Sequence, residues 1–273
     1  MTPAPAATTD LVGAAMADFA AGLRAPLWLR VAPGRRLAHE LAAYFAPVDA
    51  QERALLDLAE GPVLDVGCGP ARHARLLQAR GLTAIGLDRS VLALGVARSL
   101  GLRHWLHVDA LSGPLPPART ALLMDGNLGL AGTPAGARQL LRRLAAACGP
   151  GGHLLVNGRG PHQTPLRPLV VRDEYRDRIG PWGHWLHVRL PAVIDLAALA
   201  GWRLHHALTA GARYWACLLP RPALRVGLPP GRQHGDGDPG RQPTRPLPAA
   251  REVPVLSICR GAEPAGPCGR SRR

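Results

Sequence analysis

The stretch VLDVGCGPARHARLLQARG, Val63 to Gly81, joins a short apolar run to a glycine loop and a helical pattern. The run VLDV (63–66) is typical of a buried strand, and ARHARLLQAR (71–80) has the apolar spacing of a helix. A strand that ends in glycines and leads into a helix places backbone N–H groups and the positive end of the helix beside a ligand. The stretch therefore predicts a nucleotide-type binding loop.

Three details of this loop separate the possible ligands. A phosphate-binding P-loop needs a lysine, and the chain contains none. A dinucleotide loop needs a third glycine at the position that Arg72 occupies, which disfavours NAD and FAD. Asp65 stands in the strand just before the loop, where its charge would repel a pyrophosphate and attract an ammonium or sulfonium group. A cationic nucleoside ligand therefore fits these residues better.

Apolar runs and helical patterns continue to alternate along the chain, as is typical of strands and crossover helices around a parallel sheet. Asp88 ends the second of these strands, where a carboxylate can accept hydrogen bonds from ribose hydroxyls. Residues 202–220 predict a hairpin that turns at Ala210 and Gly211. The further predicted strands are TAIGLD (83–88), WLHVDA (105–110), ALLMDG (121–126) and HLLVNG (153–158).

In this order the motifs resemble those of the class I S-adenosylmethionine-dependent methyltransferases over residues 60–220. The resemblance rests on LDVGCGPARHARLLQARG, IGLD (85–88), HVDAL (107–111), LLMDGNLGL (122–130) and PGGHLLVNGRG (150–160). It implies an α/β fold, a Rossmann-like, seven-stranded, mostly parallel sheet with helices on both faces, and S-adenosylmethionine (SAM) as the cofactor. One position departs from the family, because its usual third glycine is Ala71 here; we expect a less flexible loop that still binds.

The resemblance also implies roles for residues at the carboxyl ends of the strands. Asp125 is expected beside the transferred methyl group, after the fourth strand. The other expected cofactor contacts are Asp65, Gly67, Cys68 and Gly69 for the amino-acid end, Asp88 for the ribose, and Asp109 with Ala110 for the adenine. As alternatives, Asp65 and Asp88 could cap the helices that follow them, and Cys68 could simply fill the loop.

The residues after the fourth and fifth strands are candidates for catalysis. Asp125 could act as a base or hydrogen-bond acceptor and Asn127 could orient the methyl acceptor, although D-G-N is equally good turn chemistry. His162 could also serve as a base. In the family, an insertion at residues 159–190 commonly contributes to the substrate pocket, and Trp182 could stack there on a flat acceptor.

No metal site is predicted. His184 and His187 have no third ligand at a sensible spacing, and the five cysteines form no CxxC pair. An odd number of cysteines without a secretory signal fits a reducing cytoplasm, and no run of about 20 apolar residues suggests a membrane span. We therefore expect a cytoplasmic protein that does not enter a membrane.

No lysine is present, so the positive charge comes from arginines, and about +6 of it lies in residues 221–273. The formal net charge is +14, and residues 221–273 hold ten prolines and ten arginines but no Phe, Trp or Tyr. Such a composition predicts a mostly disordered tail, in which VPVLSICRG (253–261) is an apolar stretch that could dock. A basic tail could contact nucleic acid, or the arginines could reflect a GC-rich coding bias.

The sequence thus predicts an N-terminal helical cap (1–59), a methyltransferase domain (60–220) and a disordered tail (221–273). The leading hypothesis is an enzyme that methylates a small molecule by in-line transfer from SAM. One alternative is methylation of RNA or protein, supported by the arginine surplus. Another is a protein that binds SAM without catalysis.

Overall fold

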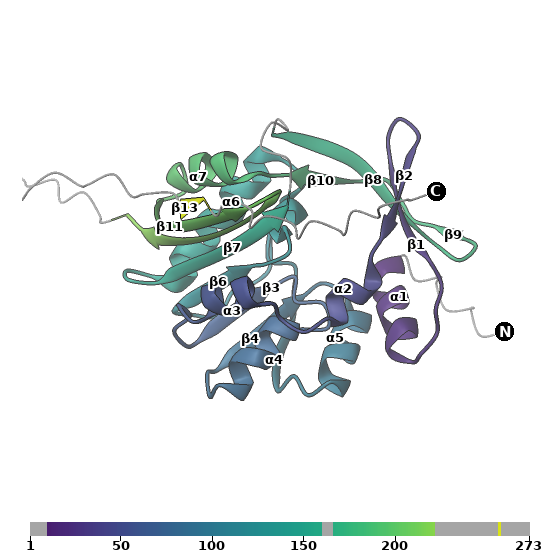
Figure 1. Cartoon of the computed structure of the whole chain (residues 1–273), viewed down its shortest axis with the longest axis horizontal. Coiled ribbons are helices and arrows are strands. Elements are labelled where there is room, and N and C mark those ends of the chain that lie inside the picture. The colour runs from purple at the N-terminus through teal and green to yellow at the C-terminus, as the bar shows by residue number, and fades with distance from the viewer. Residues whose placement is uncertain (1–9, 160–165, 222–255, 258–273) are drawn as a thin grey trace, which may run out of the picture.

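The computed structural model describes residues 10–159, 166–221 and 256–257, which form two sheets with their helices (Figure 1). The larger sheet has the strand order β11–β12–β7–β6–β3–β4–β5, with the short β13 added beside β11. Its strands are β3 (Val63–Val66), β4 (Ala84–Asp88), β5 (His104–His107), β6 (Thr120–Leu123), β7 (His153–Arg159), β11 (Trp202–Ala210), β12 (Arg213–Pro220) and β13 (Leu256–Ser257).

The larger sheet confirms the predicted seven-stranded, mostly parallel arrangement, to which β13 adds an edge. The neighbouring strands β5, β4, β3, β6 and β7 all pair in parallel. Strand β12 runs antiparallel to both β7 and β11. Strand β3 is buried along its whole length, as expected for a central parallel strand covered on both faces. Two described residues of the apolar stretch predicted at 253–261 form β13, which pairs in parallel with β11.

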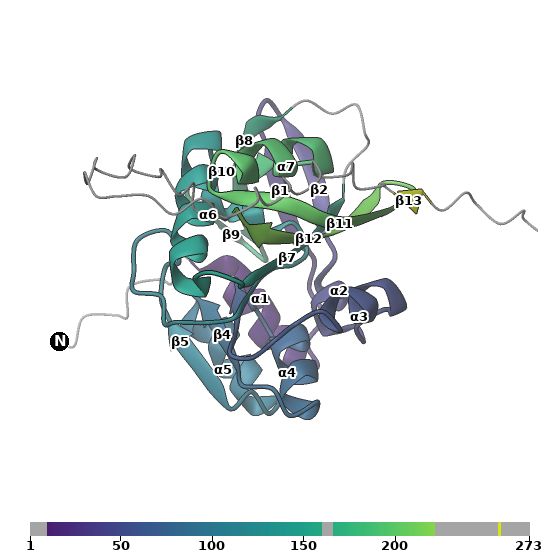
Figure 2. The same ribbon diagram turned by 90° about the vertical axis from the view of Figure 1, so that its left-hand side faces the viewer.

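Helices cover both faces of the larger sheet (Figure 2). Helices α3, α4 and α5 pack on one face through apolar side chains such as Leu56, Leu77 and Leu94, and α6 and α7 pack on the other through Leu141 and Val193. The bounds of these helices are α3 (Ala50–Leu56), α4 (Arg72–Ala79), α5 (Val91–Ser99), α6 (Pro134–Cys148) and α7 (Leu190–Ala198), and the 3₁₀ helix η1 spans Asn127–Ala131.

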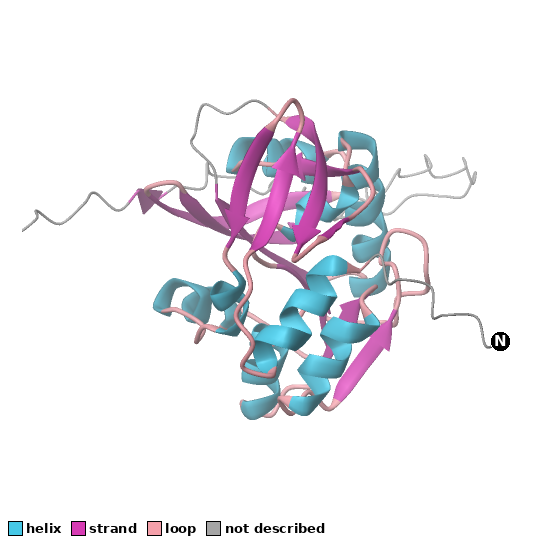
Figure 3. Cartoon of the chain, turned by 90° about the vertical axis from the view of Figure 1, so that its right-hand side faces the viewer, coloured by secondary structure: helices cyan, strands magenta, loops and turns pink. Residues whose placement is uncertain are grey.

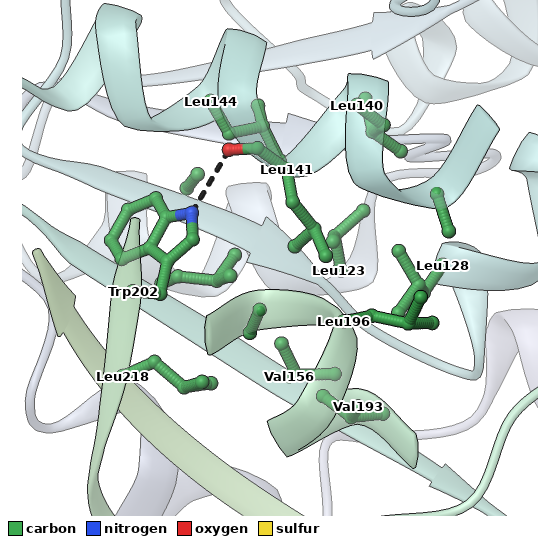
Figure 4. Packing of buried hydrophobic residues seen from close by; sticks show 14 of the residues in the cluster. Leu123, Leu128, Leu140, Leu141, Leu144, Val156, Val193, Leu196, Trp202 and Leu218 are labelled. Atoms are coloured by element: carbon green, nitrogen blue, oxygen red, sulfur yellow. Dashed lines mark hydrogen bonds between the residues drawn. The ribbon is translucent and has the colours of Figure 1, made fainter. Parts of the chain in front are cut away.

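Trp202 belongs to the core that α6 and α7 cover, and its ring points towards α6 (Figure 4). Its side chain is fully buried, and its indole N–H donates to the carbonyl oxygen of Leu141 at 2.9 Å. Burying the indole without such a partner would cost free energy, so this hydrogen bond fixes the ring between β11 and α6.

The sequence predicts a helical cap before the larger sheet, but this segment also contributes two strands to a second, antiparallel sheet. Residues 10–59 contain α1 (Leu11–Ala20), α2 (Leu41–Phe45) and α3, but also a hairpin of β1 (Leu27–Val31) and β2 (Arg35–His39). The hairpin joins β8 (Arg167–Tyr175), β9 (Arg178–Ile179) and β10 (Gly183–His187) from the insertion, in the order β10–β8–β1–β2 with β9 beside β8. The alternating Leu27, Leu29 and Val31, followed by a Pro-Gly turn, carried the signal for a strand.

The second sheet and α1 lie over the carboxyl ends of the parallel strands. Helix α1 packs on α5 and β8, and the hydroxyl of Tyr175 donates to Asp18 at 2.9 Å. Strand β10 packs on η1, which follows β6; a Cβ on Gly129 would lie 2.5 Å from the ring of Trp185. The second sheet and α1, which come from the insertion and the N-terminal segment, therefore cover the edge of the larger sheet at which the ligand is expected to bind. Within the described ranges, no helix has the length and hydropathy to span a bilayer.

The predicted division of the chain at residues 59/60 and 220/221 stays a prediction. The second sheet combines strands from both sides of the first predicted boundary. Most of the predicted tail lies outside the described residues, at 222–255 and 258–273.

Candidate functional site

The glycine loop between β3 and α4 has a backbone that explains its sequence. Gly67 and Gly69 have φ angles of +69° and +53°, in the left-handed region that favours glycine. Ala71 follows with φ +60° and is the residue before the first turn of α4. The family uses glycine at this third position, and alanine adopts the same conformation here at a cost of about 1 kcal/mol.

Two carboxylates lie directly beside this loop. Asp88, at the end of β4, accepts hydrogen bonds from the backbone N–H groups of Gly69 at 2.9 Å and Ser90 at 2.8 Å. Asp65 in β3 is 1% exposed and accepts the N–H of Ala74 at 3.2 Å. Burial raises the pKa of both carboxyl groups. No ion pair joins either of them within the described ranges, so a cationic ligand would favour their charged forms.

A small pocket opens between the glycine loop, α2 and the end of β6. It contains five of the residues predicted from sequence, whereas Gly69, Asp88, Asp109 and Ala110 lie outside its lining. The complete lining is Tyr44, Asp65, Gly67, Cys68, Pro70, Arg72, His73, Met124, Asp125 and Asn127.

Cys68 is a buried thiol in the loop. Its Sγ lies 3.6 Å from the carbonyl oxygen of Gly69, and burial raises its pKa well above the ordinary value. A thiol that resists ionisation is a poor nucleophile. The packing therefore supports the view of Cys68 as a small residue that fills the loop.

Arg72 joins charged groups that the sequence did not single out. Its guanidinium donates to both oxygens of Glu52 at 2.8 Å and to Asp125 at 2.9 Å. Glu52 is 2% exposed and also receives the side-chain amide of Asn157 at 3.3 Å. Although burial alone would raise the pKa of Glu52, the nearby His73, at 3.9 Å, and the hydrogen bonds from Arg72 hold it well below its ordinary value.

The cluster of Glu52, His73 and Asp125 offers ligand atoms within 4.8 Å of one another, a spacing that a metal ion could use. Arg72 already supplies the positive charge that these carboxylates require. The groups come from α3, α4 and the end of β6, so no local spacing in the sequence signals them.

The catalytic candidates occupy different places. Asp125 has φ +55° and a half-exposed carboxylate in the pocket, and its N–H donates to Asn157 at 2.5 Å. The amide of Asn127 donates to the carbonyl oxygens of Val66 at 2.8 Å and Gly67 at 2.9 Å, so its nitrogen braces the glycine loop. His162 lies outside the described residues.

The remaining candidates lie away from this pocket. Asp109 is exposed and accepts the N–H of Leu111 at 2.8 Å, which closes a turn after β5, and Ala110 packs against the core. Trp182, expected to flank an acceptor together with Asp125, lines a different pocket on the second sheet. The roles of all these residues stay predictions.

Helix α1, near the N-terminus of the chain, packs beside the glycine loop. Asp10 caps the helix through the N–H of Gly13 at 2.8 Å and receives the hydroxyl of Ser90 at 2.5 Å. The methyl group of Met16 lies 3.5 Å from the position of a Cβ on Gly69. The start of α1 is thus tied to the same corner as Asp88, a contact between distant segments that sequence spacing does not signal.

No protein-family model matches the chain, and no curated protein matches it significantly. A SAM-dependent methyltransferase from Bacteroides fragilis in complex with S-adenosyl-L-homocysteine has a TM-score of 0.70 at 23% identity, over 78% of this chain and 96% of that one. The CcbJ methyltransferase from Streptomyces caelestis has a TM-score of 0.53 at 16% identity, over 66% and 92%. The glycopeptide N-methyltransferase MtfA in complex with SAM has a TM-score of 0.51 at 14% identity, over 65% and 96%.

Proposed function

We propose that this chain, which has the fold of the class I SAM-dependent methyltransferases, binds SAM and transfers its methyl group to a small molecule. The observation that carries the proposal is the buried carboxylate of Asp65. It lies in the wall of the pocket, directly before the glycine loop, and none of the described basic groups forms an ion pair with it. SAM carries both an ammonium and a sulfonium group, which match this charge.

The residues around the loop fit the different parts of SAM. Asp65 and the backbone of Gly67 would hold the amino-acid end, and the carboxylate of Asp88 would hold the ribose. When bound, SAM supplies a methyl group on a sulfonium that departs readily as a neutral thioether. The protein then has mainly to align the acceptor and exclude water.

The acceptor would enter the pocket from the side of Tyr44 and Asp125. Burial and the nearby carboxylates, among them Asp125 and Asp173, raise the pKa of Tyr44, so its hydroxyl stays protonated and can donate a hydrogen bond. His39 lies 2.5 Å from that hydroxyl through its Nε2. Asp125 can accept a hydrogen bond or a proton from the acceptor.

Calorimetric titration with SAM and S-adenosylhomocysteine tests the cofactor. We expect micromolar binding of both, at least about tenfold weaker in Asp65→Asn because the ammonium loses its counter-charge. Methylthioadenosine, which lacks the amino-acid end, should bind the wild type and Asp65→Asn equally. Asp57→Asn is the matched control, since its exposed carboxylate pairs with Arg80 outside the pocket lining.

The outcomes separate binding from turnover. A folded wild type that binds neither SAM nor S-adenosylhomocysteine would refute the proposal. Binding without S-adenosylhomocysteine production across a panel of amines, alcohols and activated carbon acids would favour a SAM-binding protein without catalysis. Asp88→Ala should also abolish binding, with its folding checked by circular dichroism because Asp88 supports Gly69.

A further inference from the structure

The second sheet carries a row of arginines on the face away from α1. Arg30 of β1 is in register with Arg36 of β2 on one side and with Arg172 of β8 on the other. Residues in register point to the same face of a sheet, so the three guanidinium groups lie side by side. Tyr175, which contacts α1, has the opposite parity on β8. Figure 3 faces this sheet, at the top of the molecule.

The positive charge of this row is neutralised only in part. Glu174 accepts hydrogen bonds from Arg30 at 2.5 Å and Arg36 at 2.6 Å. Arg172 and Arg35 form no ion pair with any described carboxylate, and the buried Nε of Arg172 has no hydrogen-bond partner there. Like charges in register destabilise a sheet, and a buried donor without an acceptor is rare, so both features indicate a missing anion.

These arginines line a pocket between the β1–β2 turn and Trp182. Gly34 in that turn has open space where a Cβ would lie, which leaves the entrance clear. Trp182 is 49% exposed, with the guanidinium carbon of Arg172 4.3 Å from its ring centre. The complete lining is Arg30, Val31, Gly34, Arg35, Arg36, Arg172 and Trp182.

We propose that this pocket binds the phosphate group of a small phosphorylated ligand whose flat ring packs against Trp182. The row of three guanidinium groups, Arg30, Arg36 and Arg172, is paired with one described carboxylate, Glu174, so two positive charges remain to match the two negative charges of a phosphate monoester, whose oxygens guanidinium donors fit in pairs. The exposed part of the indole offers a surface for a planar group. The pocket shares no lining residue with the proposed SAM site, so this inference stands independently of the proposed function.

Calorimetry on the full chain, with phenyl phosphate and inorganic phosphate as probes, tests the proposal. Phenyl phosphate should bind more tightly than inorganic phosphate. Arg172→Gln should weaken the binding of phenyl phosphate by about tenfold or more, since a charged hydrogen-bond donor is lost. Arg35→Ala, at the exposed start of β2, should also weaken the binding of phenyl phosphate. Trp182→Leu should remove the preference for phenyl phosphate over inorganic phosphate.

Arg98 and Trp105 provide a matched control. They form the same type of stacked pair on α5 and β5, at 4.4 Å, outside the pocket lining. Arg98→Gln should leave the affinity for phenyl phosphate unchanged. An equal loss in Arg98→Gln, or no saturable binding of phenyl phosphate at millimolar concentration, would overturn the proposal. Tighter binding of a single-stranded oligonucleotide through Arg172 would overturn the assignment to a small ligand.

Discussion

Replacing Glu52 with glutamine would leave the buried guanidinium of Arg72 with half of its partners. Glu52 binds Arg72 through two hydrogen bonds of 2.8 Å, at side-chain exposures of 3% and 13%. Glutamine keeps the size of the side chain, and its oxygen can still accept the N–H of Asp49 in the capping box, so the change removes the charge and one of the two acceptor oxygens.

The structure sets the expected magnitude. Removing one partner of a buried ion pair costs about 3–5 kcal/mol, because the other charge stays buried. Asp125 still pairs with Arg72 at 2.9 Å, which places the expected loss near the lower end, about 3 kcal/mol. For a chain of this size, that loss lowers the Tm by about 6–12 °C.

Urea denaturation at neutral and acid pH provides the assay. The pKa of Glu52 is held below its ordinary value of 4.5, so its contribution to the free energy of unfolding is complete above that pH. The contribution declines as the pH falls towards the lowered pKa, and the difference between wild type and Glu52→Gln should shrink. The control, Glu60→Gln, breaks the exposed pair with Arg119 and should cost under about 1 kcal/mol. A loss below about 1 kcal/mol for Glu52→Gln at neutral pH would refute the reasoning.

Two further predictions address the core and the proposed cofactor site. Trp202→Phe loses the hydrogen bond to Leu141 and leaves unfilled volume, so thermal or urea unfolding should show a loss of about 2–3 kcal/mol; an unchanged midpoint would contradict the packing in Figure 4. Burial raises the pKa of Asp65 and Asp88, and SAM would bind their charged forms, so its affinity should fall as the pH drops through those raised values. Calorimetry between about pH 5 and 7.5 checks this, and Asp65→Asn should flatten the dependence.

The larger sheet could be predicted because its strands carry local signals. Strands β3 and β4 begin and end within one residue of the predicted ranges, since each is a buried run closed by a glycine loop or an acid. Strand β5 ends at His107, earlier than expected, because Asp109 turns the chain through its own side chain. A polar residue at a strand end predicts a ligand contact and a turn equally well.

The second sheet and the charged cluster depend on contacts between distant segments. Strand β1 pairs with β8, and no local pattern near Leu27 indicates a partner at Tyr175. In the sequence, Arg72 served only as an argument against NAD and FAD. The structure shows that it binds Glu52, twenty positions earlier and on another helix. The side-chain nitrogen of Asn127 binds the backbone of the glycine loop, and the predicted contact of this residue with the methyl acceptor stays a prediction.

The pairing of β1 with β8 also has a consequence for the newly made chain on the ribosome. The β1–β2 hairpin is synthesised roughly 130 residues before β8, a delay of about 6–26 s at usual translation rates. During that time the open edge of β1 offers unpaired backbone groups to any neighbouring chain. Arg30, Arg35 and Arg36 crowd this hairpin with like charge, and such charges act as gatekeepers against aggregation. The arginines proposed to bind an anion in the folded protein would thus also keep the newly synthesised hairpin from associating with the same hairpin of other chains.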